Sequence, residues 1–488
     1  MDGGYDVVVL GAGLAGFATA LRLAAAGRRT ALLEAHAVPG GCAGFWRTAG
    51  FSFDVGATTF VDFDPAGVCG QWLAEVGVDP DGERLDGYRA WLDDRTVTLW
   101  RAPGAWRRER LQAFGDTPGH RAFWALIDAL DETFWTATRS GRVVLPMRTP
   151  GALWRAASAV PVARWPLARY LRWTVGDALR ACGVDGDRAL RSCLGMLLED
   201  TVHAGVDDAP LINGAMGTAI RGAGLTRFRG GARGLWVPLM RRFRALGGAL
   251  HLQRPALAVV REGAGYRVDT PGGPLRAAVV VSALPIERTA AIGPPAWSEA
   301  LAPFVARDRP HRGGAGVLFL GVPEGEVDDH ALTHHGVCAG AHGDTTAFVS
   351  VSSPGDRASA PAGHRAVMVS THLDLAPWQG LADAAYQEQK AALGERLLAA
   401  ARRVYPRLGT APRVQAVGTP VTYARFTGRP DGAVGGVRQR LGNTNQRAVP
   451  HDLGVPGLFV VGDTTWPGLG TVSCVVGSRV VADRILGR

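Results

Sequence analysis

Short apolar runs, bounded by glycine-containing turns, recur at the start, the middle and the end of the 488-residue chain. Residues 5–10 and 30–33 have the length and apolar content of buried strands, and residues 17–26 between them follow a helical pattern. Similar strand-like runs occur at 279–284 and 458–461. Fully buried strands that alternate with helices are typical of a parallel sheet covered on both faces. The pattern therefore predicts an α/β fold.

A glycine-rich turn, residues 11–16, joins the first predicted strand to the first predicted helix with the sequence Gly-Ala-Gly-Leu-Ala-Gly. Strand, turn, helix and second strand in this order are the βαβ fingerprint of dinucleotide binding. Gly11 permits the tight turn, Gly13 lets the backbone approach a pyrophosphate, and Gly16 lets the helix pack closely on the strand. Glu34, at the end of the second strand, is placed to bind ribose hydroxyls. This acid disfavours the 2′-phosphate of NADP and leaves NAD and FAD open.

Composition and charge restrict the other classes of function. Hydrophobic residues make up 47% of the chain and charged residues 20%, which is the balance of a folded globular protein. The net charge of +9 invites a nucleic-acid interpretation. Lys390 is the only lysine, however, and the arginines are dispersed without any nucleic-acid-binding motif. We therefore expect no nucleic-acid partner, whereas a basic surface also favours anionic lipid.

The cysteine and histidine pattern argues against a metal centre. The six cysteines include no C-x-x-C, which disfavours a metal knuckle or a disulfide scaffold and suits a reducing compartment. The pair His334 and His335 lacks a nearby ligand set, and Cys338 and Cys474 have no evident histidine partner for nucleophilic catalysis. No apolar run is long enough to span a bilayer, and the strand pattern starts at Tyr5 without room for a signal peptide. We expect a cytoplasmic protein without a metal, soluble or peripherally attached to the inner face of the membrane.

Distant segments distinguish FAD from NAD. Residues 39–44 (Pro-Gly-Gly-Cys-Ala-Gly) and 51–58 follow the second strand, and residues 457–463 form a strand that ends in Gly-Asp. An elongated FAD needs contacts from such separated parts of the chain. We expect the Asp463 carboxylate to hold the ribityl chain or nearby hydroxyls. The helix after residue 470 can direct its N-terminus at the flavin N1–C2=O edge, where the reduced flavin is negatively charged.

These segments resemble the large flavoprotein group that includes amine oxidases, bacterial phytoene desaturases and carotenoid isomerases. The resemblance covers the N-terminal quarter, a central module and the last seventy or so residues. It implies a Rossmann-like FAD-binding domain with an inserted α+β substrate cap. The FAD domain is expected from residues 1–99, 230–290 and 430–488, and the cap from 100–229 and 291–429. Strand-like runs are predicted at 256–260 and 265–268 in the central module and at 317–320 and 366–370 in the cap.

The motifs and the resemblance together give the candidate site residues. Cys42 stands where many relatives carry arginine, and we favour a small buried thiol there over a thioether to flavin. Thr465 and Trp466 are catalytic candidates because their loop is expected beside the flavin; the alternative is that Trp466 packs under the loop. The predicted FAD-binding residues are Gly11, Gly13, Leu14, Ala15, Gly16, Glu34, Ala35, Gly40, Gly41, Cys42, Gly56, Ala57, Thr58, Val259, Gly462, Asp463, Gly470, Thr471 and Val472.

Residues 53–59, 419–430 and 462–470 resemble carotenoid isomerases and, most closely, terminal carotenoid 3,4-desaturases. The resemblance implies a carotenoid substrate that gains a double bond near the polyene end, with hydride passing to flavin N5 and electrons leaving to oxygen or a quinone. The conjugated polyene stabilises the cation, so no strong protein base is needed, and none is evident. A cis–trans isomerase or polyene saturase that uses reduced FAD remains open. So does a non-catalytic, flavin-containing lipid carrier.

Two related activities are disfavoured. Soluble amine oxidases use a lysine that holds water at flavin N5, whereas Lys390 lies in a charged helical stretch and is expected to face solvent. A disulfide reductase fed by NAD(P)H is disfavoured because the chain has no second strand-linked G-x-G-x-x-G and no C-x-x-C.

The stretch between Glu132 and Asp177 contains no acidic residue and is a candidate membrane-facing segment. Cationic residues mixed with interfacial aromatics suit the lipid headgroup region. The alternative is an ordinary pair of cap helices with arginines extended into solvent. Its arginines are Arg139, Arg142, Arg148, Arg155, Arg164, Arg169 and Arg172, and its interleaved aromatics are Trp154, Trp165, Tyr170 and Trp173.

Overall fold

A mostly parallel sheet forms the nucleotide-binding side of the computed structural model, which describes residues 4–339 and 345–488. Its strand order is β10-β2-β1-β13-β12-β11, and β19 pairs with β13. β1 pairs in parallel with both β2 and β13, while β11 and β12 form an antiparallel hairpin. The strands are β1 (Tyr5–Leu10), β2 (Thr30–Leu33), β10 (Ala249–His251), β11 (Ala258–Glu262), β12 (Gly265–Asp269), β13 (Leu275–Ser282) and β19 (Leu458–Val460). Segments far apart in the sequence thus build one sheet.

Both faces of this sheet are buried, as the continuous apolar runs predict. Val7 and Val9 belong to the core under one layer of helices, and Val8 and Leu10 to the core on the other face. This alternation is the period of two expected for a strand. The first layer holds α1 (Leu14–Ala25), α2 (Val68–Val76), α9 (Ala232–Ala245) and α14 (Thr471–Leu486); the second holds α10 (Ile286–Ile292) and α11 (Pro295–Asp308).

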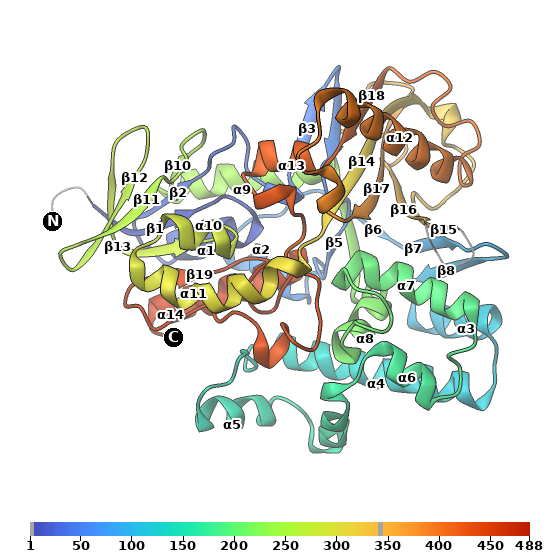
Figure 1. Cartoon of the computed structure of the whole chain (residues 1–488), viewed down its shortest axis with the longest axis horizontal. Helices are drawn as coiled ribbons and strands as arrows, with labels where there is room; N and C mark the ends of the chain where they lie inside the picture. The colour runs from blue at the N-terminus through green and yellow to red at the C-terminus, as the bar shows by residue number, and fades with distance from the viewer. Residues whose placement is uncertain (1–3, 340–344) are drawn as a thin grey trace.

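A second, largely antiparallel sheet forms the core of the cap, on the other side of the molecule (Figure 1). Its order is β18-β14-β17-β16-β15-β7-β8, and α12 (Asp383–Arg402) packs against it. Two of its strands, β7 and β8, lie before residue 101. This stretch was predicted to belong mostly to the FAD domain, which was expected to include residues 1–99. The strands are β7 (Gly87–Trp91), β8 (Thr96–Trp100), β14 (Gly314–Pro323), β15 (His334–Ala339), β16 (Thr345–Val351), β17 (His364–Leu373) and β18 (Val414–Gly418).

A group of helices packs below the cap sheet and shares an apolar core with its strands β7 and β8 (Figure 1). Among them, α5 and the 3-10 segment that follows it bury no residue. The helices are α3 (Pro103–Phe114), α4 (Pro118–Ser140), α5 (Pro150–Ser158), η2 (Val162–Arg172), α6 (Val175–Ala181), α7 (Arg188–Val202) and α8 (Leu211–Ala219). In the described ranges, no helix has the length and apolarity to cross a membrane.

Smaller elements join the two sides. A hairpin of β3 and β4 follows the nucleotide-binding segment, and β5, β9 and β6 form a separate small sheet of order β5-β9-β6. α13 precedes the last module. These elements are β3 (Phe45–Thr48), β4 (Phe51–Asp54), β5 (Phe60–Val61), β6 (Gly82–Leu85), β9 (Leu225–Phe228) and α13 (Pro420–Thr427).

Candidate active site

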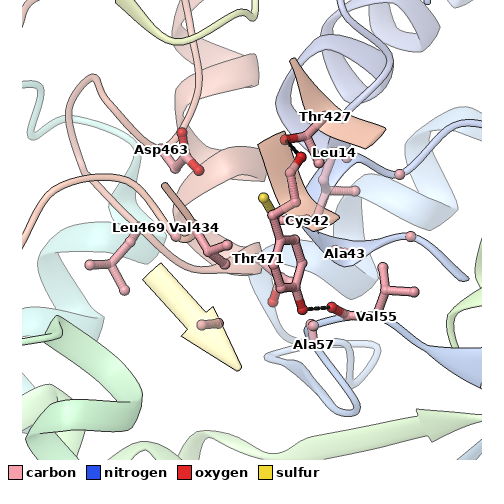
Figure 2. Close-up of a pocket in the computed structure, with 18 of the residues that line it drawn as sticks. Leu14, Cys42, Ala43, Val55, Ala57, Thr427, Val434, Asp463, Leu469 and Thr471 are labelled. Atoms are coloured by element: carbon pink, nitrogen blue, oxygen red, sulfur yellow. Dashed lines mark hydrogen bonds between the residues drawn. The ribbon is translucent and has the colours of Figure 1, made fainter. Parts of the chain in front are cut away.

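One cavity of about 950 Å³ lies between the nucleotide-binding side and the cap. Its volume is at the upper end of the range of small-molecule sites. The glycine turn after β1, the loop after β2 and the start of α14 form one part of its wall. Strands β14, β16, β17 and β18 form the opposite part. Figure 2 shows how Leu14 and Cys42 from the N-terminal module and Asp463 and Thr471 from the C-terminal module surround the same space.

The glycine turn has the geometry that a bound pyrophosphate requires. Gly11 has a φ of +94°, a conformation that favours glycine, and a Cβ at Gly13 would meet no atom within 4 Å. The backbone at Gly13 therefore faces open space. A Cβ at Gly16 would overlap the carbonyl oxygen of Gly11, so this glycine permits the close helix–strand packing and does not line the cavity.

Glu34 is held at the edge of the cavity by the glycine turn and by its own loop. Its carboxylate accepts hydrogen bonds from the backbone N–H of Ala12 and of His36, both at 2.8 Å. Burial raises the pKa of this carboxyl group, although both hydrogen bonds favour the charged form. A carboxylate fixed in this position after β2 fits the ribose of a dinucleotide.

Two helix N-termini open onto the cavity without a side-chain cap. The N-cap residues are Gly13 for α1 and Gly470 for α14, and neither supplies a capping oxygen. The unpaired backbone N–H groups and the helix dipoles favour negative charge at both places. One end fits a pyrophosphate and the other fits the electron-rich edge of a reduced flavin. The residues present therefore fit FAD.

Cys42 lies in the short segment that packs against the glycine turn. The N–H of Gly40 donates to the carbonyl of Ala12 at 2.9 Å, and Gly40 forms an isolated bridge with Gly13. Burial raises the pKa of the Cys42 thiol. A protonated thiol is a weak nucleophile, so this environment favours the structural role over a covalent link to flavin.

Arg429 is a wall residue that lies within the 419–430 motif and was not among the predicted site residues. Its guanidinium donates to Asp463 at 2.6 Å, and both side chains line the cavity. Asp463 thus lies where predicted, with its charge balanced by a partner from the loop after α13. Tyr423, in the same motif, also lines the cavity and donates its hydroxyl to the Val55 carbonyl at 2.5 Å.

The structure places most of the predicted cofactor residues in the cavity wall. Gly16 and Val259 are the exceptions. Gly16 lies under the turn, and Val259, on β11, is buried in the core. Ala256, which precedes β11, lines the wall instead. The wall contains Gly11, Gly13, Leu14, Ala15, Glu34, Ala35, Gly40, Gly41, Cys42, Gly56, Ala57, Thr58, Gly462, Asp463, Gly470, Thr471 and Val472.

The two catalytic candidates do not line the cavity. Trp466 is buried in the core beneath α14 and its ring lies 6.2 Å from that of His451. Thr465 donates its hydroxyl to the Gly462 carbonyl at 2.8 Å. Both side chains therefore stabilise the loop that carries the wall residues Asp463 and Leu469. For Trp466, this is the alternative in which the ring packs under the loop.

The cap part of the wall is mainly apolar and was not predicted from the sequence. Val317, Phe319, Phe348 and Met368 face the cavity from strands β14, β16 and β17. Two histidines, His203 and His372, interrupt this apolar surface with a direct contact. They come from positions 169 residues apart, so no local motif connects them.

The remaining candidates lie outside the site. Lys390 is on α12, with its ammonium group 6.0 Å from the ring of Tyr386, and it does not line the cavity. Within residues 4–339 and 345–488, no group of three His, Cys, Asp or Glu side chains could hold a metal ion.

A Rossmann-like sheet, a cavity with two open helix N-termini and an inserted cap define a dinucleotide-binding flavoprotein oxidoreductase. The N-terminal region, residues 9–76, matches the model of the NAD(P)-binding Rossmann-like domain. The chain belongs to the flavin-containing amine oxidoreductase family, whose model matches residues 190–486, more than half of its length. FAD is therefore its cofactor. The predicted fold class, a Rossmann-like FAD domain with an inserted cap, is confirmed.

The relatives divide into full-length and local matches. Prolycopene isomerase 1 of an Oncidium hybrid cultivar is 23% identical across 99% of this chain and 84% of its own length. A phytoene dehydrogenase of Streptomyces griseus is 56% identical over 52 residues, which cover 11% of this chain and 10% of the relative. The crystal structure of an oxidoreductase from Methanosarcina mazei covers 98% of this chain and 99% of its own, with a TM-score of 0.66 at 16% identity, and supports the fold.

Proposed function

We propose that this flavoenzyme desaturates a long apolar polyene of the carotenoid type near one end of the molecule. The observation that carries the proposal is the continuity of one cavity from the glycine turn to the apolar strands of the cap. Such a cavity holds a dinucleotide at one end and brings a water-insoluble chain against its reactive part. The local similarity to a phytoene dehydrogenase and the full-length similarity to a prolycopene isomerase both support this substrate class.

The chain's own residues bind, orient and exclude water. Bound FAD supplies the acceptor for a hydride. The N-terminus of α14, at Thr471, stabilises negative charge on the side of the cavity where Asp463 and Arg429 also lie. Phe319 and Phe348 line the cap part with apolar surface, so a polyene displaces water from it.

A second reaction, cis–trans isomerisation of a polyene with reduced FAD, has an observation in its favour. The relatives that match along almost the whole chain are prolycopene isomerases, whereas the match to a phytoene dehydrogenase is confined to 52 residues. Isomerisation leaves the substrate composition unchanged and requires no net loss of a proton. The redox state of the flavin at turnover separates the two reactions.

We propose that the protein takes its substrate from an anionic bilayer at the inner face of the membrane. The segments α5 and η2 would contact this bilayer. Trp154 is 71% exposed and Trp165 is 49% exposed. Other exposed apolar side chains on this surface are Leu153, Val162 and Leu171. Arginines between them match the negative surface of such a bilayer. α8 packs against η2, and its Met216 lines the cavity, so α8 connects η2 with the site.

The test is anaerobic mixing of FAD-loaded protein with acyclic carotenoids in liposomes, with flavin absorbance and product chromatography as readouts. Desaturation predicts bleaching of oxidised flavin together with a product of longer conjugation. An isomerised product that appears only after dithionite reduction supports the second reaction instead. Binding without any product under either condition marks a lipid carrier. A quinone or oxygen that restores the flavin absorbance identifies the class of electron acceptor.

A further inference from the structure

Two buried histidines meet inside the cavity wall. His203 and His372 both line the cavity, and their Nε2 atoms lie 3.0 Å apart. One ring must therefore donate its Nε2–H and the other accept it. Among the described residues that line the cavity, these two histidines alone share a hydrogen bond between their ring nitrogens.

The fold holds this pair in place from three elements. His203 ends α7 with a φ of 56°, a left-handed conformation that is uncommon for a residue other than glycine. His372 is near the end of β17. Gly435 lies against the His203 ring, since a Cβ at that glycine would overlap the ring carbon Cε1. The backbone conformation and the missing side chain together fix the histidine pair.

The pair also lies close to the cofactor side of the cavity. Gly435, which lies against the His203 ring, lines the same cavity as Cys42. Cys42 belongs to the segment that packs on the glycine turn and lines the predicted flavin site. The histidine pair and the predicted flavin site therefore share one cavity.

The charges around the pair are arranged asymmetrically. Glu199, on α7, lies 3.7 Å from Nδ1 of His372, and this buried nitrogen makes no hydrogen bond in the described structure. Asp200, also on α7, acts on His372 in the same direction. Arg438 opposes protonation of both rings, although Asp374 pairs with it at 2.6 Å. A positive charge is thus better accommodated on His372 than on His203.

Burial lowers the pKa of both histidines, so the pair is neutral near pH 7. We assign the Nε2–H to His203 and the Nδ1–H, directed at Glu199, to His372. In this arrangement the Nδ1 of His203 carries the free lone pair. Within the described ranges this atom has no hydrogen-bond partner, and its residue lines the cavity.

We propose that His203 is the catalytic base for the polyene and that His372 is a positioning residue that carries the resulting charge against Glu199. This inference rests on the proposed desaturation. One C–H bond of the substrate loses its hydrogen and both electrons to bound flavin. The adjacent C–H bond breaks, its proton goes to Nδ1 of His203, and its electron pair completes the new C=C bond. The bridging proton moves from Nε2 of His203 to Nε2 of His372.

A neutral buried imidazole is strong enough for this step. Loss of hydride leaves a delocalised polyene cation, which releases a neighbouring proton readily to a weak base. When oxygen or a quinone takes the two electrons and the hydrogen from the reduced flavin, the stored proton goes to that acceptor, which becomes hydrogen peroxide or hydroquinone, and the histidine pair is neutral again.

Single-turnover bleaching of FAD-loaded protein by an acyclic carotenoid in liposomes tests the role of each residue. Removal of a general base costs 100-fold or more, so His203→Gln is expected to slow bleaching by about 100-fold. We expect about a tenfold loss for His372→Gln, because the base remains but its partner is gone. Carotenoid binding, followed by its absorbance shift, should change little in both. His364→Gln, outside the cavity, is the matched control and should bleach like the wild type.

Two readouts separate this role from a merely structural one. The wild-type bleaching rate should be constant at neutral pH and fall as the pair gains a proton in acid, and Glu199→Gln should move that fall to lower pH. Nitrogen-15 spectra of histidine-labelled protein, with FAD and without substrate, should show both rings titrating as one coupled unit. In His372→Gln, His203 should titrate alone.

The outcomes distinguish failure of the inference from failure of the proposed function. Wild-type desaturation with unchanged rates in both histidine variants overturns the inference and leaves the function intact. Independent titration of the two rings also overturns it. If the wild type yields no desaturated product, the desaturase function fails and the base role fails with it.

Discussion

The two parts of the cavity wall are built in different ways. On the nucleotide-binding side, backbone atoms at glycines such as Gly13 and Gly41 face the cavity, together with two helix N-termini. On the cap side, side chains such as Phe319 and His372 face it from strands and helices that are distant in sequence. A backbone surface suits a cofactor shared by many proteins, whereas a side-chain surface determines which substrate is accepted.

This difference also predicts which changes affect which ligand. A substitution at a wall glycine introduces atoms where the cofactor must approach and should leave the cap unchanged. A substitution in the cap should alter the substrate or its delivery and leave FAD affinity unchanged. The following predictions test that separation.

The largest effect is expected for Gly13→Val. The φ of −66° and ψ of 172° at Gly13 are accessible to valine, and a Cβ there meets only open space, so the protein should fold. The new side chain then occupies the place of the pyrophosphate, and we expect FAD affinity to fall by about 100-fold or more, roughly 3 kcal/mol. Fluorescence quenching of added FAD measures this loss.

Gly186→Val is the matched control for that change. A Cβ at Gly186 also meets no atom within 4 Å, and this glycine lies outside the cavity. FAD affinity should stay at the wild-type value. If Gly13→Val bound FAD normally, the glycine turn would not be the pyrophosphate site and the comparison between the two walls would fail.

The same contrast explains what the sequence predicted. The βαβ unit is local, so strands at 5–10 and 30–33 were predicted with their observed bounds, and the helix predicted at 17–26 runs from Leu14 to Ala25. The hairpin strand predicted at 256–260 lies at 258–262, and Val259, predicted to bind the cofactor, is buried in the core. Glycine and turn chemistry operate over a few residues and are therefore readable without a structure.

The cap part of the site could not be predicted in the same way. His203 and His372 become neighbours only when α7 and β17 pack together, and no spacing rule relates positions 169 residues apart. Trp466 was predicted beside the flavin because its loop lies there, but an apolar ring can turn into the core as well as into the cavity. Loop position follows from the motif, whereas side-chain direction depends on tertiary packing.

An intermediate effect is expected for the double variant Trp154→Ser, Trp165→Ser. Both rings are exposed on α5 and η2, so their loss should not destabilise the core. Each ring supplies apolar surface to the proposed bilayer contact, and binding to vesicles with anionic lipid should weaken by about 30-fold. Sedimentation with vesicles measures the binding, and FAD affinity should be unchanged.

Leu257→Ser is the control for the tryptophan pair. Leu257 is 50% exposed but lies on the nucleotide-binding side. Vesicle binding should remain at the wild-type level in this variant. An equal loss in both proteins would mean that general surface apolarity, and not α5 with η2, mediates the association.

The smallest effect concerns the pH dependence of FAD binding through Glu34. Burial raises the pKa of this carboxyl group, so in the folded apoprotein it gains a proton at a higher pH than an exposed glutamate. In the apoprotein, the ionised Glu34 lowers the free energy of unfolding at pH values above its raised pKa. This destabilisation is lost as pH falls towards the ordinary pKa of 4.5. FAD binding has the opposite sign, because protonation removes an acceptor for the ribose hydroxyls.

We therefore expect FAD affinity to fall by about fivefold as pH decreases through the raised pKa, the cost of one net hydrogen bond. Glu34→Gln should show the reduced affinity already at neutral pH, without this pH dependence. Titration of apoprotein with FAD between pH 8 and pH 5 measures both curves. An equal slope in the two proteins would assign the pH dependence to another group. A flat wild-type curve would mean that the ribose is held by backbone atoms alone, as the pyrophosphate is.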